Sequence, residues 1–426
     1  MQCKIKIRRV SFMKKNVIVG QSGGPTAVIN ASLYGVVYEA LNREDTIGTV
    51  YGMINGIEGF LHDTVMDMKP LELSGELELI KTTPGSFLGS CRYKLPEDLQ
   101  DKVYPQLFEK FESYNIGYFF YIGGNDSMDT VSKLSRYAEQ INSDIRFIGV
   151  PKTIDNDLVL TDHTPGFGSA AKYVASTIRE IVIDASVYDN KKSVTIVEIM
   201  GRHAGWLAAS SVLARKFEGD NPVLIYLPEV AFDQDAFIEK VKAALETTPN
   251  LVVCISEGIN DGKGTFVCEL ASDVGVDTFG HKMLTGSGKY LENLVKERLG
   301  VKVRSVELNV SQRCSSAMLS NADQKEAIAS GAFAVTSALK GATGKMIAFK
   351  RTDEDFTKDS SEDYRIDYVT EDVNLICNQE KTVPLEWITK DGSDISTAFI
   401  RYAAPLIQGE VSVPTENGLP KFAYRR

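Results

Sequence analysis

Hydrophobic positions along the chain fall into two alternating patterns. Short runs rich in β-branched and aromatic residues end in Gly, Asp or Ser, and longer stretches with apolar residues at helical spacing follow them. The short runs predict strands at 16–21, 118–122, 147–150, 194–199, 223–227, 251–256, 302–308 and 345–350. The longer stretches predict helices at 26–41, 128–139, 169–182, 204–214, 235–246, 288–299 and 323–339. This alternation is typical of βα units around a parallel sheet.

The predicted strands are too many for one comfortable sheet in a small domain, so the pattern indicates two α/β domains. The length of 426 residues agrees with two or three domains, because a domain usually has about 100–200 residues. A charged segment at 351–363 predicts a surface excursion. The hydrophobic pattern returns at 383–409, and we expect that segment to pack back on the body.

The charge balance excludes a nucleic acid as the main partner. The chain has 47 Lys and Arg against 57 Asp and Glu, a formal net charge of −10, whereas a nucleic-acid-binding surface needs the opposite balance. An anionic substrate must therefore meet local basic side chains. No apolar run approaches the roughly 18–20 residues of a membrane-spanning helix, so we expect no membrane association.

The start of the chain and its cysteines favour a cytoplasmic protein. Residues 1–13 are basic without an apolar segment of signal-peptide length, and they read as an extension upstream of the first predicted strand. The six cysteines form no CxxC pair and no cluster beside a histidine. This spacing supports neither a disulfide framework nor a zinc site.

Two glycine-containing loops follow predicted strands. Gly23 and Gly24 lie between the strand at 16–21 and its helix, where backbone N–H groups can cradle an anion; a plain βα turn explains them equally well. After the strand at 118–122 come Asn125 and Asp126, which offer acceptors for a cation. Ordinary helix N-caps are an equally good explanation for that second loop.

Charged side chains follow two further strands. Lys152, Thr153, Asp155 and Asp157 crowd into one turn, where a carboxylate can take a proton from a hydroxyl and a lysine can hold a phosphate. Capping aspartates in an Asx-turn are the simpler explanation when this motif is taken alone. Arg202 follows the strand at 194–199 and suits a phosphate or carboxylate, or else caps a surface helix. We interpret the neighbouring histidine, 203, as structural.

All four elements project from the carboxyl ends of strands, where open α/β sheets bind their ligands. Their convergence indicates a phosphate-handling cleft with a carboxylate base. The sequence therefore predicts a phosphoryl transferase.

A family resemblance rests on motifs in a fixed order, namely SGGPTAVINA, TPGSFLGSCR, IGGNDS, PKTIDND, TDHTPGFGSA, EIMGRHAGW and Gln312-Arg313. From about residue 16 to 340 the chain resembles the 6-phosphofructokinase family. It looks most like the pyrophosphate-dependent branch, in which an acidic residue and a lysine stand at the places of Asp126 and Lys152. The ATP-using branch typically has glycine at both.

The resemblance implies two Rossmann-like domains with the active site in the cleft between them. Residues 14–166 with about 312–370 would form the pyrophosphate and magnesium domain. Residues 167–311 with about 371–426 would form the sugar-phosphate domain. The implied reaction is reversible transfer of a phosphoryl group from pyrophosphate to the 1-hydroxyl of fructose 6-phosphate, a step of glycolysis and gluconeogenesis.

The resemblance also implies residue roles. Asp155 would be the base, Lys152 would stabilise the transferred group, and Asp126 would set the donor. Gly23, Gly24, Arg92 and Lys152 would bind pyrophosphate. The sugar phosphate would contact Thr153, Asp155, Met200, Gly201, Arg202, Glu257, Arg304 and Arg313.

Departures from the family pattern qualify these roles. Asn125 stands where the family commonly has a magnesium-linked Asp, so Mg²⁺ would rest on Asn125, Asp126, or water and pyrophosphate. Val310 stands where the family has a histidine. The family also has an arginine that reaches the sugar phosphate from a neighbouring subunit. This chain lacks that arginine, and Lys191 and Lys192 are the basic residues nearest to its place in the sequence.

Regulation and alternatives complete the expectations. Tyr34 and Tyr38 stand where regulated ATP enzymes have effector-binding arginines, so we expect no nucleotide regulation. Shared active sites in the family imply a homodimer or homotetramer.

Two alternatives stay open, an ATP-dependent 6-phosphofructokinase and a non-catalytic regulatory subunit that binds only sugar phosphate. Asp126 and Lys152 argue against the first, and an intact Asp155 argues against the second.

Overall fold

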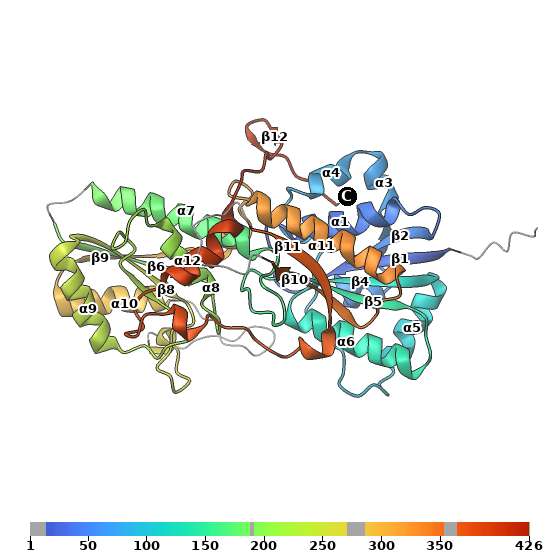
Figure 1. The fold of residues 1–426 in the computed structure, drawn as a ribbon, viewed down its shortest axis with the longest axis horizontal. Coiled ribbons are helices and arrows are strands. Elements are labelled where there is room, and N and C mark those ends of the chain that lie inside the picture. The colour runs from blue at the N-terminus through green and yellow to red at the C-terminus, as the bar shows by residue number, and fades with distance from the viewer. Residues whose placement is uncertain (1–13, 188–190, 271–285, 353–363, 426) are drawn as a thin grey trace, which may run out of the picture.

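The computed structural model describes residues 14–187, 191–270, 286–352 and 364–425. Two sheets organise two lobes that lie end to end (Figure 1). The first lobe is built on a seven-stranded sheet and the second on a four-stranded sheet. The extension predicted at 1–13 and most of the surface excursion, 353–363, lie outside the described residues.

The first sheet is mostly parallel, with strand order β11-β10-β5-β4-β1-β2-β3. Only its edge strands β3 and β11 pair antiparallel with their neighbours. Its strands are β1 (Lys15–Gln21), β2 (Ile47–Met53), β3 (Val65–Asp67), β4 (Ile116–Gly123), β5 (Arg146–Pro151), β10 (Lys345–Arg351) and β11 (Ile366–Asp372). Its helices are α1 (Ile29–Leu41), α2 (Gly56–Leu61), α3 (Lys69–Leu73), α4 (Glu76–Ile80), α5 (Val103–Ser113), α6 (Asn125–Gln140) and α11 (Asn321–Leu339).

Helices cover both faces of this sheet because its central strands are apolar on both faces. Successive residues of a strand point to opposite faces. Val17 and Val19 pack in the core beneath α1 and α11, whereas Ile18 between them packs with α5 and α6. Phe120 and Phe119 divide between the same two cores. This two-sided burial is what makes the strands read as continuous hydrophobic runs.

The second sheet is entirely parallel, with strand order β7-β8-β6-β9. Its strands are β6 (Ser193–Ile199), β7 (Leu224–Tyr226), β8 (Asn250–Ser256) and β9 (Lys302–Glu307). Its helices are α7 (Phe167–Ser186), α8 (Trp206–Ser210), α9 (Gln234–Thr247), α10 (Ser287–Leu299) and α12 (Thr397–Ala403). A short hairpin, β12 (Thr415–Glu416) with β13 (Leu419–Pro420), lies near the end of the chain.

The structure confirms all eight predicted strands and a helix in each of the seven predicted helical stretches, with corrections at three helix starts. The helix predicted from 26 begins at Ile29, because 22–28 form a loop in which the Val28 N–H donates to the Thr26 hydroxyl. The helix predicted at 128–139 begins earlier, at Asn125. The stretch 204–214 is a short α-helix from Trp206 continued by a 3₁₀ turn.

The carboxyl-terminal part packs back on the body, as predicted. Val383, Phe399 and Leu406 are buried in the core of the second lobe, while Ala423 is buried in a core of the first. Strands β10 and β11 complete the first sheet. The two-domain boundaries stated above remain our proposal for how the chain divides.

Within the described residues, the structure shows no helix that could span a membrane and no bonded cysteine. None of their helices combines the length and apolarity that a membrane crossing requires. Their five cysteines are all free thiols.

Candidate active site

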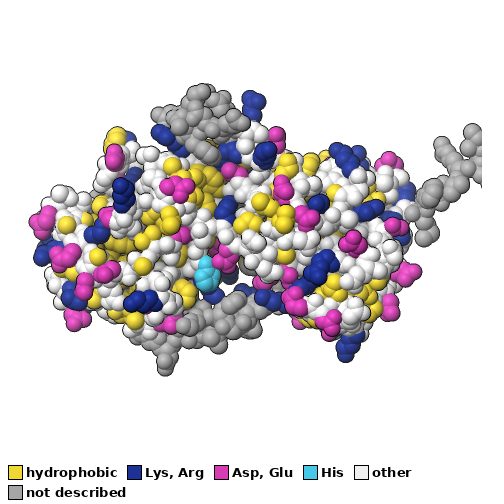
Figure 2. All heavy atoms as spheres, turned by 60° about the horizontal axis from the view of Figure 1, so that its bottom comes forward, with side chains coloured by type: hydrophobic (Ala, Val, Ile, Leu, Met, Phe, Trp, Pro, Cys, Tyr) yellow, Lys and Arg dark blue, Asp and Glu magenta, His cyan; other side chains and the backbone are white. Residues whose placement is uncertain are grey.

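The site lies where the strand order of the first sheet reverses. From β1 the chain continues to β2 on one side, whereas from β4 it continues to β5 on the other. The loops after β1 and β4 therefore diverge and leave a crevice at the carboxyl edge, the usual ligand position in such sheets. The carboxyl end of β6 faces it from the second lobe. A space-filling view shows a hollow between the lobes, with a histidine and acidic side chains at its mouth (Figure 2).

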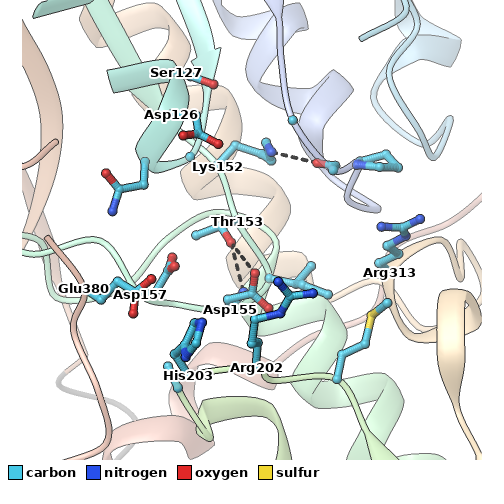
Figure 3. A pocket seen from close by; sticks show the side chains of 18 of the residues that line it. Asp126, Ser127, Lys152, Thr153, Asp155, Asp157, Arg202, His203, Arg313 and Glu380 are labelled. Carbon is cyan, nitrogen blue, oxygen red and sulfur yellow. Dashed lines mark hydrogen bonds between the residues drawn. The ribbon is translucent and has the colours of Figure 1, made fainter. Parts of the chain in front are cut away.

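Residues from both lobes line one cavity of about 770 Å³ in this crevice. Eleven of the predicted site residues line it, namely Gly23, Gly24, Asn125, Asp126, Lys152, Thr153, Asp155, Met200, Arg202, Glu257 and Arg313. Figure 3 shows Lys152, Asp155 and Arg313 around the same space. The structure thus brings together residues that are up to 290 positions apart in the sequence.

The glycine loop after β1 forms one wall of the cavity. Gly23 has φ of +78°, a conformation that favours glycine, and a Cβ there would lie 3.3 Å from the Lys152 amine. The Gly24 carbonyl accepts a hydrogen bond from Lys152 Nζ at 2.7 Å. The Gly23 N–H itself makes only a long contact of 3.4 Å with the Cys91 carbonyl. The loop is therefore open toward the cavity and held by the lysine.

The first turn of α6 forms the opposite wall. Asp126 lies in this turn, where the helix dipole stabilises a negative charge, and it pairs with Lys94 at 3.1 Å. The Asn125 side chain is used structurally. Its Oδ1 accepts the Asn378 N–H, and its Nδ2 donates to the Gln379 carbonyl at 2.6 Å. Asn125 thus fastens a distant segment to the cavity wall.

The segment after β5 supplies the central charges. The Thr153 hydroxyl donates to Asp155 Oδ2 at 3.2 Å and accepts the Asp155 N–H at 3.1 Å. Burial raises the pKa of the Asp155 carboxyl, although the Thr153 hydrogen bond and Lys152 oppose that shift. Burial lowers the pKa of the Lys152 amine to about 8, against the attraction of Asp155. Both groups are thus adjusted toward neutral pH, a common property of reactive groups.

Loops of the second lobe close the cavity. The Met200 N–H donates to Gln312 Oε1 at 3.2 Å, and the Gly201 N–H donates to Glu257 Oε1 at 3.3 Å. Gly201 has φ of +147°, and a Cβ there would lie 2.7 Å from a backbone carbonyl oxygen, so glycine is required. Burial raises the pKa of Glu257 to about 7.

Three predicted residues do not line this cavity. Gly201 lies directly behind it through its bond to Glu257. Arg92 is exposed and follows Cys91, whose carbonyl contacts the glycine loop. Arg304 lies on β9 with a side chain that is 49% exposed and 3.8 Å from Asp184. Its role in the sugar site of its own chain therefore lacks geometric support.

Other lining residues escaped the sequence prediction. Asp157 and His203 also face the cavity, the first from a motif that the sequence had singled out. Lys94, Asn378 and Glu380 line it as well. Figure 3 shows Glu380 next to Asp157, and burial together with the charge of Asp155 raises the pKa of Asp157 to about 7. Nothing in the sequence near 378–380 signals a contact with residues 250 positions earlier.

The oxygen-rich lining suits a hard cation that brings its own ligands. The carboxylates of Asp126, Asp155, Asp157 and Glu380 face the cavity. Among the described residues no three His, Cys, Asp or Glu form a ready cage for a metal. Mg²⁺ usually binds one or two carboxylates together with substrate phosphates, so the lining fits it better than it fits zinc.

Comparisons with known proteins agree with this geometry. The family model described as Phosphofructokinase matches residues 16–338. A curated pyrophosphate–fructose 6-phosphate 1-phosphotransferase from Halomonas elongata is 40% identical over 96% of this chain and 95% of its own length. One from Xanthomonas campestris is 42% identical over the same shares. The crystal structure of a pyrophosphate-dependent phosphofructokinase from Marinobacter aquaeolei matches with a TM-score of 0.84 at 38% identity, covering 96% of this chain and 95% of that one.

The resemblance first found in the motifs therefore extends over the whole fold. The matched family region contains the second sheet, strands β1 to β5 of the first sheet and most of the residues that line the crevice. The chain belongs to the phosphofructokinase family.

Proposed function

We propose that the chain transfers a phosphoryl group from pyrophosphate to the 1-hydroxyl of fructose 6-phosphate, giving fructose 1,6-bisphosphate and phosphate, reversibly. The observation that most strongly supports this proposal is that Asp155, Lys152 and the glycine loop meet in one cavity. The names of the relatives support pyrophosphate as donor. Phosphoryl transfer requires positioning, charge stabilisation and a base rather than a covalent enzyme intermediate.

Asp155 is the proposed base. Its carboxylate is oriented by the Thr153 hydroxyl, and burial raises its pKa, which increases its strength as a proton acceptor. It takes the proton from the sugar 1-hydroxyl as that oxygen attacks the terminal phosphorus of pyrophosphate. The bond from phosphorus to the bridging oxygen breaks, and inorganic phosphate leaves.

Lys152 is the proposed stabiliser of the transferred group. Its amine is fixed by the hydrogen bond to the Gly24 carbonyl and faces the cavity beside the glycine loop. Its positive charge is therefore in place for pyrophosphate before the reaction begins. The oxygens of pyrophosphate lie against the open glycine loop, with Arg92 at its edge.

The second lobe is the proposed sugar-phosphate site. Arg202 and Arg313 supply positive charge for the 6-phosphate, and Glu257 accepts a sugar hydroxyl. Thr153 and Met200 form the floor between them, and Gly201 supports Glu257 from behind it.

Mg²⁺ is the proposed cofactor, held by Asp126 and by the oxygens of pyrophosphate. When bound it neutralises charge on the donor phosphates. Asn125 is a poor ligand, because its amide oxygen already accepts the Asn378 N–H.

A homodimer or homotetramer is the proposed assembly. Arg304 supports it, since this exposed side chain lies outside the cavity of its own chain and is available to a neighbouring one. A monomer in sedimentation that is fully active would contradict this assembly. The cytoplasmic location stays a prediction.

We also propose that nucleotides do not regulate the enzyme at α1. The Tyr34 hydroxyl donates to Glu78 at 2.7 Å, Lys81 lies 4.9 Å over its ring, and Tyr38 stacks on it. The face is filled by its own side chains and offers no guanidinium group. A several-fold change in sugar-phosphate affinity on adding ADP or phosphoenolpyruvate would contradict the proposal.

The direct test is formation of fructose 1,6-bisphosphate from fructose 6-phosphate, pyrophosphate and Mg²⁺, followed also in reverse. We expect the unaltered chain to work in both directions and Asp155→Ala to lose about 10²–10⁴-fold in turnover while sugar-phosphate binding largely survives. Near-normal turnover of Asp155→Ala would place the base elsewhere. Binding of the sugar phosphate without any turnover would favour the regulatory-subunit alternative.

A further inference from the structure

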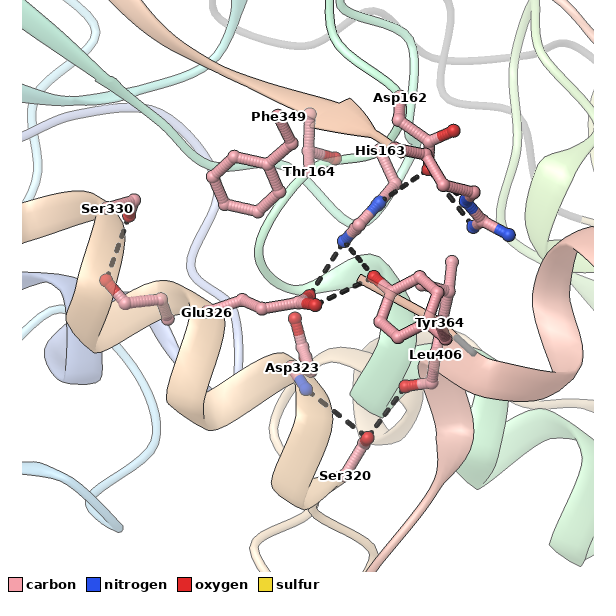
Figure 4. A network of polar contacts seen from close by, with 12 residues as sticks. Asp162, His163, Thr164, Ser320, Asp323, Glu326, Ser330, Phe349, Tyr364 and Leu406 are labelled. Carbon is pink, nitrogen blue, oxygen red and sulfur yellow. Dashed lines mark hydrogen bonds and ion pairs between the residues drawn. The ribbon is translucent and has the colours of Figure 1, made fainter. Parts of the chain in front are cut away.

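A buried charged network surrounds His163 (Figure 4). It is bonded through Thr164 to the segment 153–157, which carries Asp155. At its centre His163, 1% exposed, has both ring nitrogens next to carboxylates. Nδ1 lies 2.7 Å from Asp162 Oδ1, and Nε2 lies 2.7 Å from Glu326 Oε2. A neutral imidazole can donate from one nitrogen only, so two ionised carboxylates at this distance require the doubly protonated, positively charged ring. Burial opposes that charge, but the two carboxylates outweigh it and raise the pKa of His163 to about 9.

An outer layer completes the hydrogen bonds of the two carboxylates. The Tyr364 hydroxyl donates to the second oxygen of Glu326 at 2.7 Å. Arg351 donates to Asp162 Oδ1 at 3.1 Å, and its guanidinium lies over the Tyr364 ring. Burying ionic groups costs desolvation free energy. Only charged and hydrogen-bonding partners in good geometry compensate for that cost. The network is thus built to hold one geometry.

The network is joined to the catalytic segment by Thr164, the residue after His163. The Thr164 N–H donates to Asn156 Oδ1 at 3.1 Å, and its hydroxyl donates to the Thr153 carbonyl at 2.8 Å. The Thr153 N–H returns a bond to the Pro165 carbonyl at 3.3 Å. These contacts flank Asp155 on both sides. A shift of His163 must therefore move the carboxylate that we propose as the base.

The network also joins the two lobes. Glu326 lies in the first turns of α11, which packs in the first lobe. One turn earlier on the same face, Asp323 accepts the N–H groups of Gly166 and Ser169 at 2.9 and 2.8 Å, at the start of α7 in the second lobe. One helix of the first lobe thus holds both the loop behind Asp155 and the first turn of a second-lobe helix.

We propose that His163 and Glu326 are positioning residues for phosphoryl transfer. Their buried ion pair fixes the segment 153–157, and with it the Asp155 carboxylate, relative to the phosphate loop and the sugar site. The inference rests on the proposed function, because it assigns these residues a role in that reaction. Neither side chain touches the cavity, so they act through Thr164 and Asn156.

The kinetic test uses Glu326→Gln, His163→Gln and the double variant. A displacement of about 1 Å in reacting groups can cost about 10²-fold, so we expect turnover per folded molecule to fall at least about tenfold. The KM values for both substrates should change less than about threefold. Because the residues act as a pair, the double variant should lose no more than the worse single variant.

The matched control is Asp394→Asn, which breaks the ion pair between Arg215 and Asp394, 2.7 Å apart, in the second lobe away from the cavity. It should lower stability without lowering turnover. Equal losses of turnover in the control and in Glu326→Gln would overturn the proposal. Losses of the two single variants that simply multiply in the double variant would also overturn it.

A second readout needs no activity. Amide hydrogen exchange of 153–157 should be faster in Glu326→Gln than in the unaltered chain, and unchanged in Asp394→Asn. Unchanged exchange in Glu326→Gln overturns the positioning role even if turnover falls. If the unaltered chain shows no pyrophosphate activity, the proposed function fails, while the exchange result still decides the coupling. Should Glu326→Gln not fold, Tyr364→Phe removes only one bond to Glu326, and a smaller change in the same direction is expected.

Discussion

At the scale of single residues, we propose that Asp126 is the side chain that separates pyrophosphate from ATP. The family resemblance puts its carboxylate where the α-phosphate of ATP would lie. Two unit charges about 4 Å apart repel by about 4 kcal/mol at an effective dielectric near 20. The Asp126 side chain is 64% exposed and paired with Lys94, and both conditions weaken that repulsion. We therefore expect Asp126→Gly to raise ATP use by about tenfold or more, less than the full Coulomb value.

The control for this prediction is Asp126→Asn, which removes the charge and keeps the size. It should admit ATP as well as Asp126→Gly does, as measured by kcat/KM for ATP. If only Asp126→Gly admits ATP, steric exclusion sets the donor. If neither admits it, the donor is selected elsewhere in the cavity.

Lys152 carries a pH prediction. Its pKa is lowered to about 8, mainly by burial, and it must be protonated to stabilise the transferred phosphoryl group. The kcat/KM with pyrophosphate should thus fall as the pH rises above about 8, because that ratio reports groups of the free enzyme. Lys152→Gly should lose about 10²–10³-fold in turnover and also lose this alkaline limb. An unchanged limb in the variant would assign it to another group.

At the scale of elements, the start of α6 and the segment 378–381 act as one unit. Asn125 holds the segment through two hydrogen bonds, and Lys381 continues it by donating to the Asp162 carbonyl at 2.7 Å. We expect Asn125→Ala to destabilise the fold by about 1 kcal/mol, the usual net worth of such bonds. The Mg²⁺ concentration for half-maximal activity should change less than about twofold, since the single side-chain oxygen of Asn125 already accepts the Asn378 N–H.

The comparison variant is Asp126→Asn, which should raise the Mg²⁺ requirement clearly more than Asn125→Ala does. Activity titrated against Mg²⁺ at saturating pyrophosphate measures both. A rise in the requirement that is confined to Asn125→Ala would make the amide a ligand after all.

What the sequence could predict at this scale follows from the range of the interactions. Strands buried on both faces, such as β4 and β8, are long apolar runs and were predicted within one or two residues. The edge strands β3 and β11 were not predicted, since β3 has three residues and β11 is only partly buried. The predicted start of α1 was three residues too early, because the Val28 N–H donates to the Thr26 hydroxyl in the loop that precedes the helix.

The site divides in the same way. Residues such as Gly23, Asp155 and Arg202 stand directly after buried strands, so topology alone places them at one edge. Glu380 reaches the cavity through tertiary packing of the carboxyl-terminal part, which leaves no local pattern. Arg304 was assigned to the sugar site by the family resemblance, but its strand places it outside the cavity of its own chain.

At the scale of the whole molecule, the His163 network lies where the lobes join and should make stability depend on pH. The charged or titratable groups around the His163 ring come from several elements, namely Asp162, Glu326, Asp323, Tyr364, Arg351 and Lys381. The pKa of His163 rises from 6.5 to about 9 on folding. The folded state thus holds the proton more strongly, and this contribution is complete below pH 6.5 and lost as the pH rises through about 9.

The unaltered chain should therefore exceed His163→Gln in free energy of unfolding by an amount that shrinks from pH 6.5 to 9. Subtracting the variant removes the opposing contributions of other groups, such as Lys152. Urea unfolding at several pH values measures the difference. A difference that is constant with pH, or that grows, would show that the ring is not charged in the folded state.

The central claim is that this cavity uses pyrophosphate. The most direct measurement is the ratio of kcat/KM for pyrophosphate to that for ATP, obtained from fructose 1,6-bisphosphate formation with Mg²⁺ in one enzyme preparation. We predict a ratio of at least about 10, because the exposure of Asp126 and its pairing with Lys94 leave only part of the charge repulsion against ATP. A ratio near or below one, with robust turnover on ATP, would contradict the account.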